Sequence, residues 1–114
     1  MIVITVVLDE SGLLKSCDVR GHAGAGKRGT DIVCAAVSAL ARTALAVLAG
    51  RDGITAAGGP GGRGEFFLEI KSLSGAGREF LAGAGTFLVE GFRSVAAEFP
   101  QNCTLDIQTS RERL

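Results

Sequence analysis

The sequence has no tryptophan, no tyrosine, a single histidine and only three cysteines among its 114 residues. Any aromatic recognition therefore depends on six phenylalanines. Three cysteines cannot all pair within one chain, and the spacing of Cys17, Cys34 and Cys103 fits no disulfide framework and no zinc-binding pattern. We therefore expect free thiols in a reducing cytoplasm, with neither a metal nor another cofactor.

An excess of charge of one sign is also lacking, because twelve basic residues balance twelve acidic ones. This balance gives no support to direct binding of nucleic acid or of an anionic membrane. The N-terminal segment has no basic region and reaches Asp9 after eight residues, so it fits neither a signal peptide nor a membrane span. The longest apolar stretch, residues 32–50, is rich in alanine and carries Arg42 near its middle, which favours a buried helix.

Glycine, in contrast, is abundant. The 17 glycines are about twice the usual share of roughly 7%. They cluster at 21–29, 58–64 and 75–85. Such clusters indicate tight turns, or places where another group approaches the backbone closely.

Hydrophobic patterning predicts five strands and two helices in the order ββαββαβ. The length suits one domain over residues 1–114. Hairpins without regular βαβ alternation favour an α+β fold, a two-layer sandwich with a mostly antiparallel sheet and two helices. The expected strands cover 2–8, 13–21, 54–57, 66–71 and 103–108, the helices 30–50 and 77–99, with a flexible loop at 21–29 and a turn region at 58–62.

Both helices have an apolar pattern. Almost every face of the first is apolar, which predicts burial on more than one side, partly against a second subunit. Its apolar residues at helical spacing are Val33, Ala36, Val37, Leu40, Ala44, Val47 and Leu48. The second helix should turn inward Phe80, Ala84, Phe87, Leu88, Phe92 and Val95, although Gly83, Gly85 and Gly91 each weaken it by about 1 kcal/mol relative to alanine.

One pair of residues has the chemistry of a nucleophile and its base. His22, the only histidine, precedes Cys34 by twelve residues, and Cys34 lies in the first turn of the first helix. Unpaired N–H groups at a helix start stabilise a thiolate and can donate to an oxyanion. An imidazole can remove the thiol proton and later protonate a leaving amine. The pair therefore predicts a cysteine protease site.

Other roles for these residues stay open. Cysteine is often a small buried hydrophobe, as we expect for Cys17 and Cys103 in their strands. Asp31 either caps the helix or orients His22. Ser38, one turn beyond Cys34, is expected to pack or to bond to the helix backbone.

Two further patterns point to other chemistry. Residues 21–27 match the phosphate-binding pattern G-x-x-x-x-G-K, but Arg28 stands where a hydroxyl should bind magnesium. A metal site built from Cys17, His22 and Cys34 resembles no familiar ligand spacing. Both are weaker hypotheses than the protease.

The segment around the pair resembles the ribosomal-processing cysteine protease family, Prp. The similar residues are Gly21-His22-Ala23 and, after a short gap, Gly29-Thr30-Asp31-Ile32-Val33-Cys34-Ala35-Ala36-Val37-Ser38. The length and the hairpin-then-helix order are also similar to this family. Between the two motifs the chain is small and basic, without the aromatic and acidic residues that the family often has there.

The resemblance implies a cytoplasmic, homodimeric cysteine endopeptidase that removes the N-terminal extension of a large-subunit ribosomal protein. It implies that Cys34 is the nucleophile and His22 the general base, with Asp31 at the motif's aspartate. A mobile loop that closes on the substrate would comprise Gly21, Ala23, Gly24, Ala25, Gly26, Lys27, Arg28 and Gly29. The alternatives are a non-catalytic ribosome-associated binding module with a structural Cys34 and, more remotely, a phosphate binder.

Overall fold

The computed structural model describes residues 1–21, 31–62 and 64–114 of the chain. These residues form five strands and two helices in the predicted order. The elements are β1 (Ile2–Leu8), β2 (Leu14–Gly21), α1 (Asp31–Leu48), β3 (Ile54–Pro60), β4 (Glu65–Leu73), α2 (Gly77–Glu98) and β5 (Cys103–Thr109).

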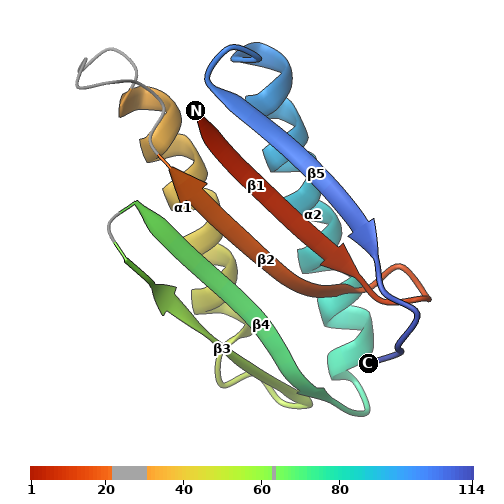
Figure 1. The fold of residues 1–114 in the computed structure, drawn as a ribbon. Helices are drawn as coiled ribbons and strands as arrows, with labels where there is room; N and C mark the ends of the chain where they lie inside the picture. The colour runs from red at the N-terminus through yellow and green to blue at the C-terminus, as the bar shows by residue number, and fades with distance from the viewer. Residues whose placement is uncertain (22–30, 63) are drawn as a thin grey trace.

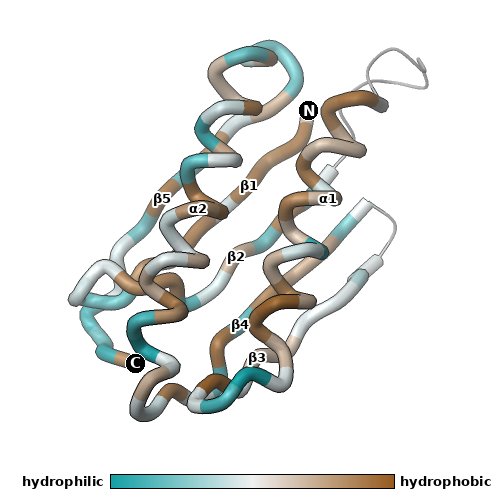
Figure 2. The backbone as a smooth tube through the Cα atoms, turned by 180° about the vertical axis from the view of Figure 1, so that it is seen from behind, coloured by the Kyte–Doolittle hydropathy of each residue, from teal (hydrophilic) through white to brown (hydrophobic). Residues whose placement is uncertain are grey.

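The strands form one sheet in the order β3-β4-β2-β1-β5. All neighbours are antiparallel except β1 and β5, which pair in parallel with Ile2 opposite Cys103. Both helices cover the same face of this sheet (Figures 1 and 2). The predicted α+β class, a two-layer arrangement with a mostly antiparallel sheet, is confirmed.

The alternation along the strands separates the two faces of the sheet. Ile2, Ile4 and Val6 of β1 are buried toward the helices, as expected for a strand with one covered face. The other face is mostly polar, apart from the exposed Val3 and Phe67. Ion pairs two residues apart lie along its strands, Arg20 with Asp18 and Lys71 with Glu69. The open face is therefore the solvated side of the domain.

Strand β3 is longer than predicted. It continues through part of the expected turn, and Pro60 at its end pairs with Phe66 of β4. Gly58 makes this pairing possible, because a side chain there would overlap the backbone of Phe67. The turn itself is tight, and the Gly61 N–H donates to the Glu65 carbonyl at 3.0 Å.

Helix α1 buries one face within this chain. Its buried residues follow helical spacing: Val33, Val37, Ala41, Ala44 and Leu48. Ile32 and Val47 are 63% and 44% exposed. The apolar excess seen in the sequence therefore leaves hydrophobic side chains at the surface, and α1 is brown over most of its length in Figure 2. No helix among the described residues is long and apolar enough to cross a membrane.

Helix α2 turns inward most of the predicted residues, and Phe80, Ala84 and Val95 are partly buried against the core. Leu88 and Phe92 are buried as expected, but Phe87 is 74% exposed. The expectation for Phe87 was wrong because its neighbour Leu88 faces the sheet, and successive helical residues point about 100° apart. The residues that do face inward are Gly77, Leu81, Gly85, Leu88, Val89 and Phe92.

Two of the α2 glycines lie at points of close packing. A Cβ on Gly85 would lie 3.0 Å from the Leu14 Cβ of β2. A Cβ on Gly91 would lie 2.9 Å from the Leu40 Cδ2 of α1. Helix α2 forms despite these glycines because tertiary packing of its apolar face outweighs their low helix propensity.

Candidate active site

Cys34 lies in the first turn of α1, three residues after its first residue, Asp31. Its side chain is half-buried, whereas Cys17 and Cys103 are 1% and 2% exposed. All three cysteines are free thiols. Of the three, only Cys34 also lies at the start of a helix, where N–H groups without intrahelical partners favour an anionic sulfur.

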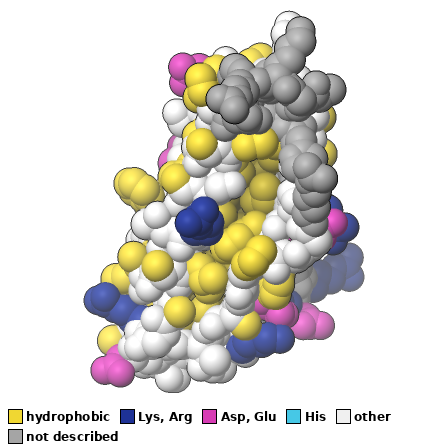
Figure 3. Space-filling view, turned by 90° about the vertical axis from the view of Figure 1, so that its left-hand side faces the viewer, with side chains coloured by type: hydrophobic (Ala, Val, Ile, Leu, Met, Phe, Trp, Pro, Cys, Tyr) yellow, Lys and Arg dark blue, Asp and Glu magenta, His cyan; other side chains and the backbone are white. Residues whose placement is uncertain are grey.

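A cavity of about 460 Å³ opens beside Cys34. Helix α1 forms one wall, the β3–β4 hairpin forms the opposite wall, and the start of β1 and the end of β2 lie between them. Figure 3 shows this side of the molecule, where hydrophobic side chains line a hollow with a basic side chain among them. The lining residues are Ile2, Val19, Gly21, Cys34, Val37, Ser38, Arg42, Pro60, Gly62, Gly64, Glu65 and Phe66.

Gly21 fixes where β2 ends at this cavity. Its φ of 95° suits glycine, and a Cβ there would overlap the Met1 carbonyl oxygen. Its N–H donates to the Gly64 carbonyl at 3.0 Å, which ties the end of β2 to the turn of the β3–β4 hairpin. Gly21 is thus the last residue of β2, next to His22 in the sequence. His22 lies outside the described residues.

The other two thiols are held in their neutral form. Burial, and secondarily the charge of Asp18, raises the pKa of Cys17 to about 12. Burial also raises the pKa of Cys103, and the negative charge that Cys34 can carry adds to the effect. A thiol that stays protonated is a poor nucleophile. The chemistry of the site is therefore concentrated at Cys34.

The cavity also contains two charged side chains, Arg42 and Glu65. Glu65 Oε2 accepts the Gly62 N–H at 3.3 Å, within its own hairpin. The Arg20 guanidinium bonds to Asp18, and that bond, with the charges of Asp18 and Glu65, raises the pKa of Arg20. Within the described residues, no group of three or more His, Cys, Asp or Glu side chains could hold a metal ion.

The structure brings some of the predicted site residues together. Gly21, Cys34 and Ser38 line the same cavity. Asp31 is the first residue of α1, while His22 and the rest of the predicted loop, Ala23 to Gly29, lie outside the described residues. The phosphate-binding pattern lies there as well, apart from Gly21.

Sequence reasoning missed the wall formed by the β3–β4 hairpin and the place of Arg42 in the cavity. The hairpin residues are far from Cys34 in the chain, and no local sequence pattern predicts such a contact. Arg42 did give a signal, since it follows Cys34 by eight residues and is the only charged residue between Ile32 and Gly50.

An accessible thiol at a helix start, beside a cavity with room for several side chains, is the arrangement of a cysteine-dependent hydrolase. The sequence matches the model of the family "Cysteine protease Prp" over residues 1–104. The chain belongs to this family and is a cysteine protease.

Solved structures share the fold. SMU.848 from Streptococcus mutans is 28% identical, with a TM-score of 0.80 and coverage of 96% of both chains. The essential ribosomal processing protease Prp from S. aureus, in complex with a substrate peptide, is 20% identical, with a TM-score of 0.77 and coverage of 95% of this chain and 100% of that chain. A complex of the same protease with a covalently linked product peptide gives a TM-score of 0.76 at 20% identity, with the same coverage. A search of the curated proteins finds no match.

Proposed function

We propose that this protease removes the N-terminal extension of a large-subunit ribosomal protein in the cytoplasm, with Cys34 as the nucleophile and His22 as the general base. The observation that carries the proposal is the contrast among the three cysteines. Cys34 is accessible at a helix start and lines a cavity, whereas Cys17 and Cys103 are buried and protonated. Membership of the Prp family supports the substrate class.

The reaction follows the general chemistry of thiol proteases. His22 takes the thiol proton, and the Cys34 Sγ attacks the carbonyl carbon of the scissile bond. N–H groups at the start of α1 donate to the developing oxyanion. His22 then gives the proton to the leaving amine, which departs as one product and leaves a thioester on Cys34. Water, deprotonated by His22, hydrolyses this thioester, releases the other product as an acid and restores the thiol.

The walls of the cavity favour an apolar peptide beside the scissile bond. Val37 of α1 and Phe66 of β4 lie on opposite walls, and Ile2 lies between them. Burial of apolar substrate side chains there supplies binding energy of about 25 cal/mol per Å² of area removed from water. We assign residues 21–29 to substrate contacts, and Asp31 to capping the helix or to orienting His22.

The test uses the unprocessed ribosomal protein of the same organism as substrate. The wild-type protein should shorten it at one position, as measured by intact mass spectrometry. Cys34→Ala and His22→Ala should lose this activity by several orders of magnitude, while Cys103→Ala should retain it. A substrate that keeps its extension with the wild-type protein would refute the proposed substrate, and cleavage by Cys34→Ala would refute the nucleophile.

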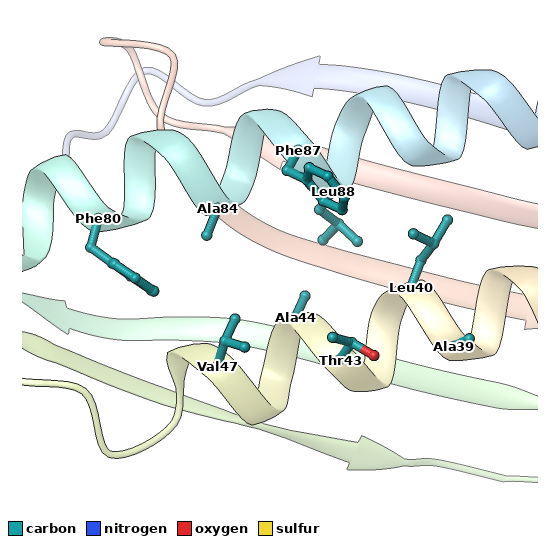
Figure 4. A pocket seen from close by; sticks show the side chains of 9 residues that line it. All are labelled: Ala39, Leu40, Thr43, Ala44, Val47, Phe80, Ala84, Phe87 and Leu88. Atoms are coloured by element: carbon teal, nitrogen blue, oxygen red, sulfur yellow. The ribbon is translucent and has the colours of Figure 1, made fainter.

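We also propose that the protein is a homodimer joined through a second apolar groove. This groove, of about 410 Å³, lies between α1 and α2, and Figure 4 shows that its side chains come from both helices. Among the described residues that line it, Thr43 is the only polar one. Phe87, 74% exposed, stands beside Leu40 and Ala44 of the opposite helix. A protruding ring next to an apolar hollow is self-complementary, which is what a two-fold interface requires.

A further inference from the structure

Arg42 is the basic residue among the described residues that line the Cys34 cavity, and it forms no ion pair with another described residue. It also makes no hydrogen bond among these residues and is exposed. The other charged residue of the cavity is different, because the Glu65 carboxylate is bonded to the Gly62 N–H and lies opposite Arg20 in the β2–β4 pairing. Among the described residues, Arg42 is therefore the positive charge that the cavity presents without a bonded partner.

The position of Arg42 relative to Cys34 is set by the helix that carries both. Ser38 lies between them, and all three, four residues apart, line the cavity. Eight residues correspond to a rise of about 12 Å along a helix axis. An extended peptide covers this distance with three to four residues, at about 3.3 Å each. A substrate that follows α1 from the scissile bond would pass Arg42 at that point.

We propose that Arg42 is a specificity-determining residue that binds a carboxylate side chain of the substrate, three or four residues from the scissile bond. This inference rests on the proposed function, in which the Cys34 cavity is the peptide-binding site. Guanidinium and carboxylate match in geometry and can form two parallel hydrogen bonds. The walls of the cavity are otherwise largely apolar, which limits competition from water and strengthens the pairing.

The experiment separates binding from cleavage. The substrates are fluorescein-labelled peptides from the cleavage region of the ribosomal protein. Each peptide carries Glu, Gln or Lys at one of four positions, which lie three or four residues before or after the scissile bond. Their affinity is measured by fluorescence anisotropy with Cys34→Ala protein, so that no peptide is cut. The same peptides are then cleaved by protein with Cys34 intact. Each measurement is repeated with Arg42→Gln, Arg42→Glu and the control Arg93→Glu, which makes the same charge change on α2, outside the cavity.

At one of the four positions, protein with Arg42 should bind Glu peptides about fivefold more tightly than Gln peptides, the scale of a partly exposed ion pair. Arg42→Gln should abolish this preference, Arg42→Glu should reverse it in favour of Lys, and Arg93→Glu should leave it unchanged. A rise in salt should weaken it. In the cleavage measurement, the kcat/KM values for the Glu, Gln and Lys peptides should follow the same order as their affinities.

The outcomes distinguish the inference from the function on which it rests. A Glu preference that is absent, or that survives in Arg42→Glu, overturns the role of Arg42 even where cleavage is efficient. A preference that follows Arg42 in the binding measurement, without cleavage by the wild-type protein, supports the role of Arg42 and refutes the proposed protease substrate. Peptides that bind to none of the variants refute both.

Discussion

At the scale of single residues, the three cysteines show how surroundings decide reactivity. Cys17 and Cys103 belong to strands whose covered face packs on the helices, and burial raises the pKa of both thiols. Cys34 belongs to a helix start at the edge of a cavity. The same side chain is thus a packing residue in two places and a candidate nucleophile in the third.

We predict that iodoacetamide at neutral pH alkylates Cys34 at least about tenfold faster than Cys17 or Cys103, because only thiolates react and both buried thiols stay protonated. Mass spectrometry of peptic peptides over time measures the three rates. Protein unfolded in urea is the control, in which the three rates should converge. Labelling of Cys34 no faster than of the buried pair would favour a structural role for Cys34, as in a non-catalytic binding module.

A second residue of note, Asp9, holds the opposite end of the sheet together. Its carboxylate is fully buried and accepts hydrogen bonds from the Ser11 N–H and hydroxyl, the Leu13 N–H and the Leu114 N–H. Burial alone would raise its pKa, but the hydrogen bonds from Ser11, Leu114 and Leu13 outweigh burial and lower the pKa from 3.8 to about 2. The charged form is therefore part of the folded state.

We predict that Asp9→Asn lowers the free energy of unfolding at pH 7 by about 2 kcal/mol, the equivalent of the pKa shift. A depressed pKa stabilises the fold at pH values above the unfolded-state pKa. This contribution is therefore complete above about pH 4 and is lost as the pH falls toward 2. Urea unfolding from pH 7 to pH 2 should show the wild type and the variant converging.

Asp106→Asn is the control for this series, because Asp106 is exposed on the open face of the sheet and bonds only to the Gln108 side chain among the described residues. It should change stability by less than about 0.5 kcal/mol. A difference in the free energy of unfolding between wild type and Asp9→Asn that persists unchanged at pH 2 would contradict this prediction. It would show that the stabilisation by Asp9 does not depend on the charge of its carboxylate.

At the scale of elements, contacts with neighbouring elements determine which glycines of α2 can be replaced by a larger residue. Gly83 is exposed and a Cβ there would meet nothing within 4 Å, whereas Gly85, half a turn further, faces the Cβ of Leu14. Leu14 is 2% exposed and fixed in β2, so its Cβ cannot move without the strand. Gly85 is therefore a packing residue and Gly83 is not.

We predict that Gly83→Ala raises the free energy of unfolding by about 1 kcal/mol, the gain in helix propensity. Gly85→Ala should lack this gain and lower stability by about 1–2 kcal/mol, because overpacking of a core costs about that much. Urea denaturation of the two variants measures the difference. Equal stabilisation by both variants would mean that β2 shifts to make room for the new methyl group and that the contact between position 85 and Leu14 does not limit packing.

Elements with strong local patterns were predictable and those that depend on distant partners were not. β1 is a continuous run of β-branched residues that ends in Leu8, and its bounds were predicted correctly. The end of β3 was missed because Gly58 and Pro60 are typical of turns, and only the pairing with β4 makes them a strand. Likewise, Cys34 could be singled out from its helix start, but the Arg42 and hairpin walls of its cavity result from contacts that no local pattern encodes.

At the scale of the whole molecule, the two cavities lie on different sides of α1. The Cys34 cavity lies between α1 and the β3–β4 hairpin, and the second groove between α1 and α2. A partner docked in the α1–α2 groove would bury Phe87 and Val47, neither of which lines the Cys34 cavity. Dimerisation and substrate binding are therefore expected to be separable by mutation.

We predict that the wild-type protein sediments as a dimer and that Phe87→Glu shifts it to a monomer, because a carboxylate in an apolar interface loses its hydration. Analytical ultracentrifugation over a range of concentrations measures the shift. Phe67→Glu is the matched control, since Phe67 is 43% exposed on the open face of the sheet, away from the groove. A monomeric wild type, or a dimer that survives Phe87→Glu, would contradict the proposed interface.

The position of the chain ends has a practical consequence for anyone who handles this enzyme. Met1 packs on Gly21 and Ile2 lines the Cys34 cavity, while Leu114 is held by Asp9 near the opposite end of the sheet (Figure 1). An affinity tag joined to the first residue would emerge beside Cys34 and compete with the substrate for space. We expect such a tag to raise KM, and its proteolytic removal to restore it. A tag placed after Leu114 should leave turnover untouched.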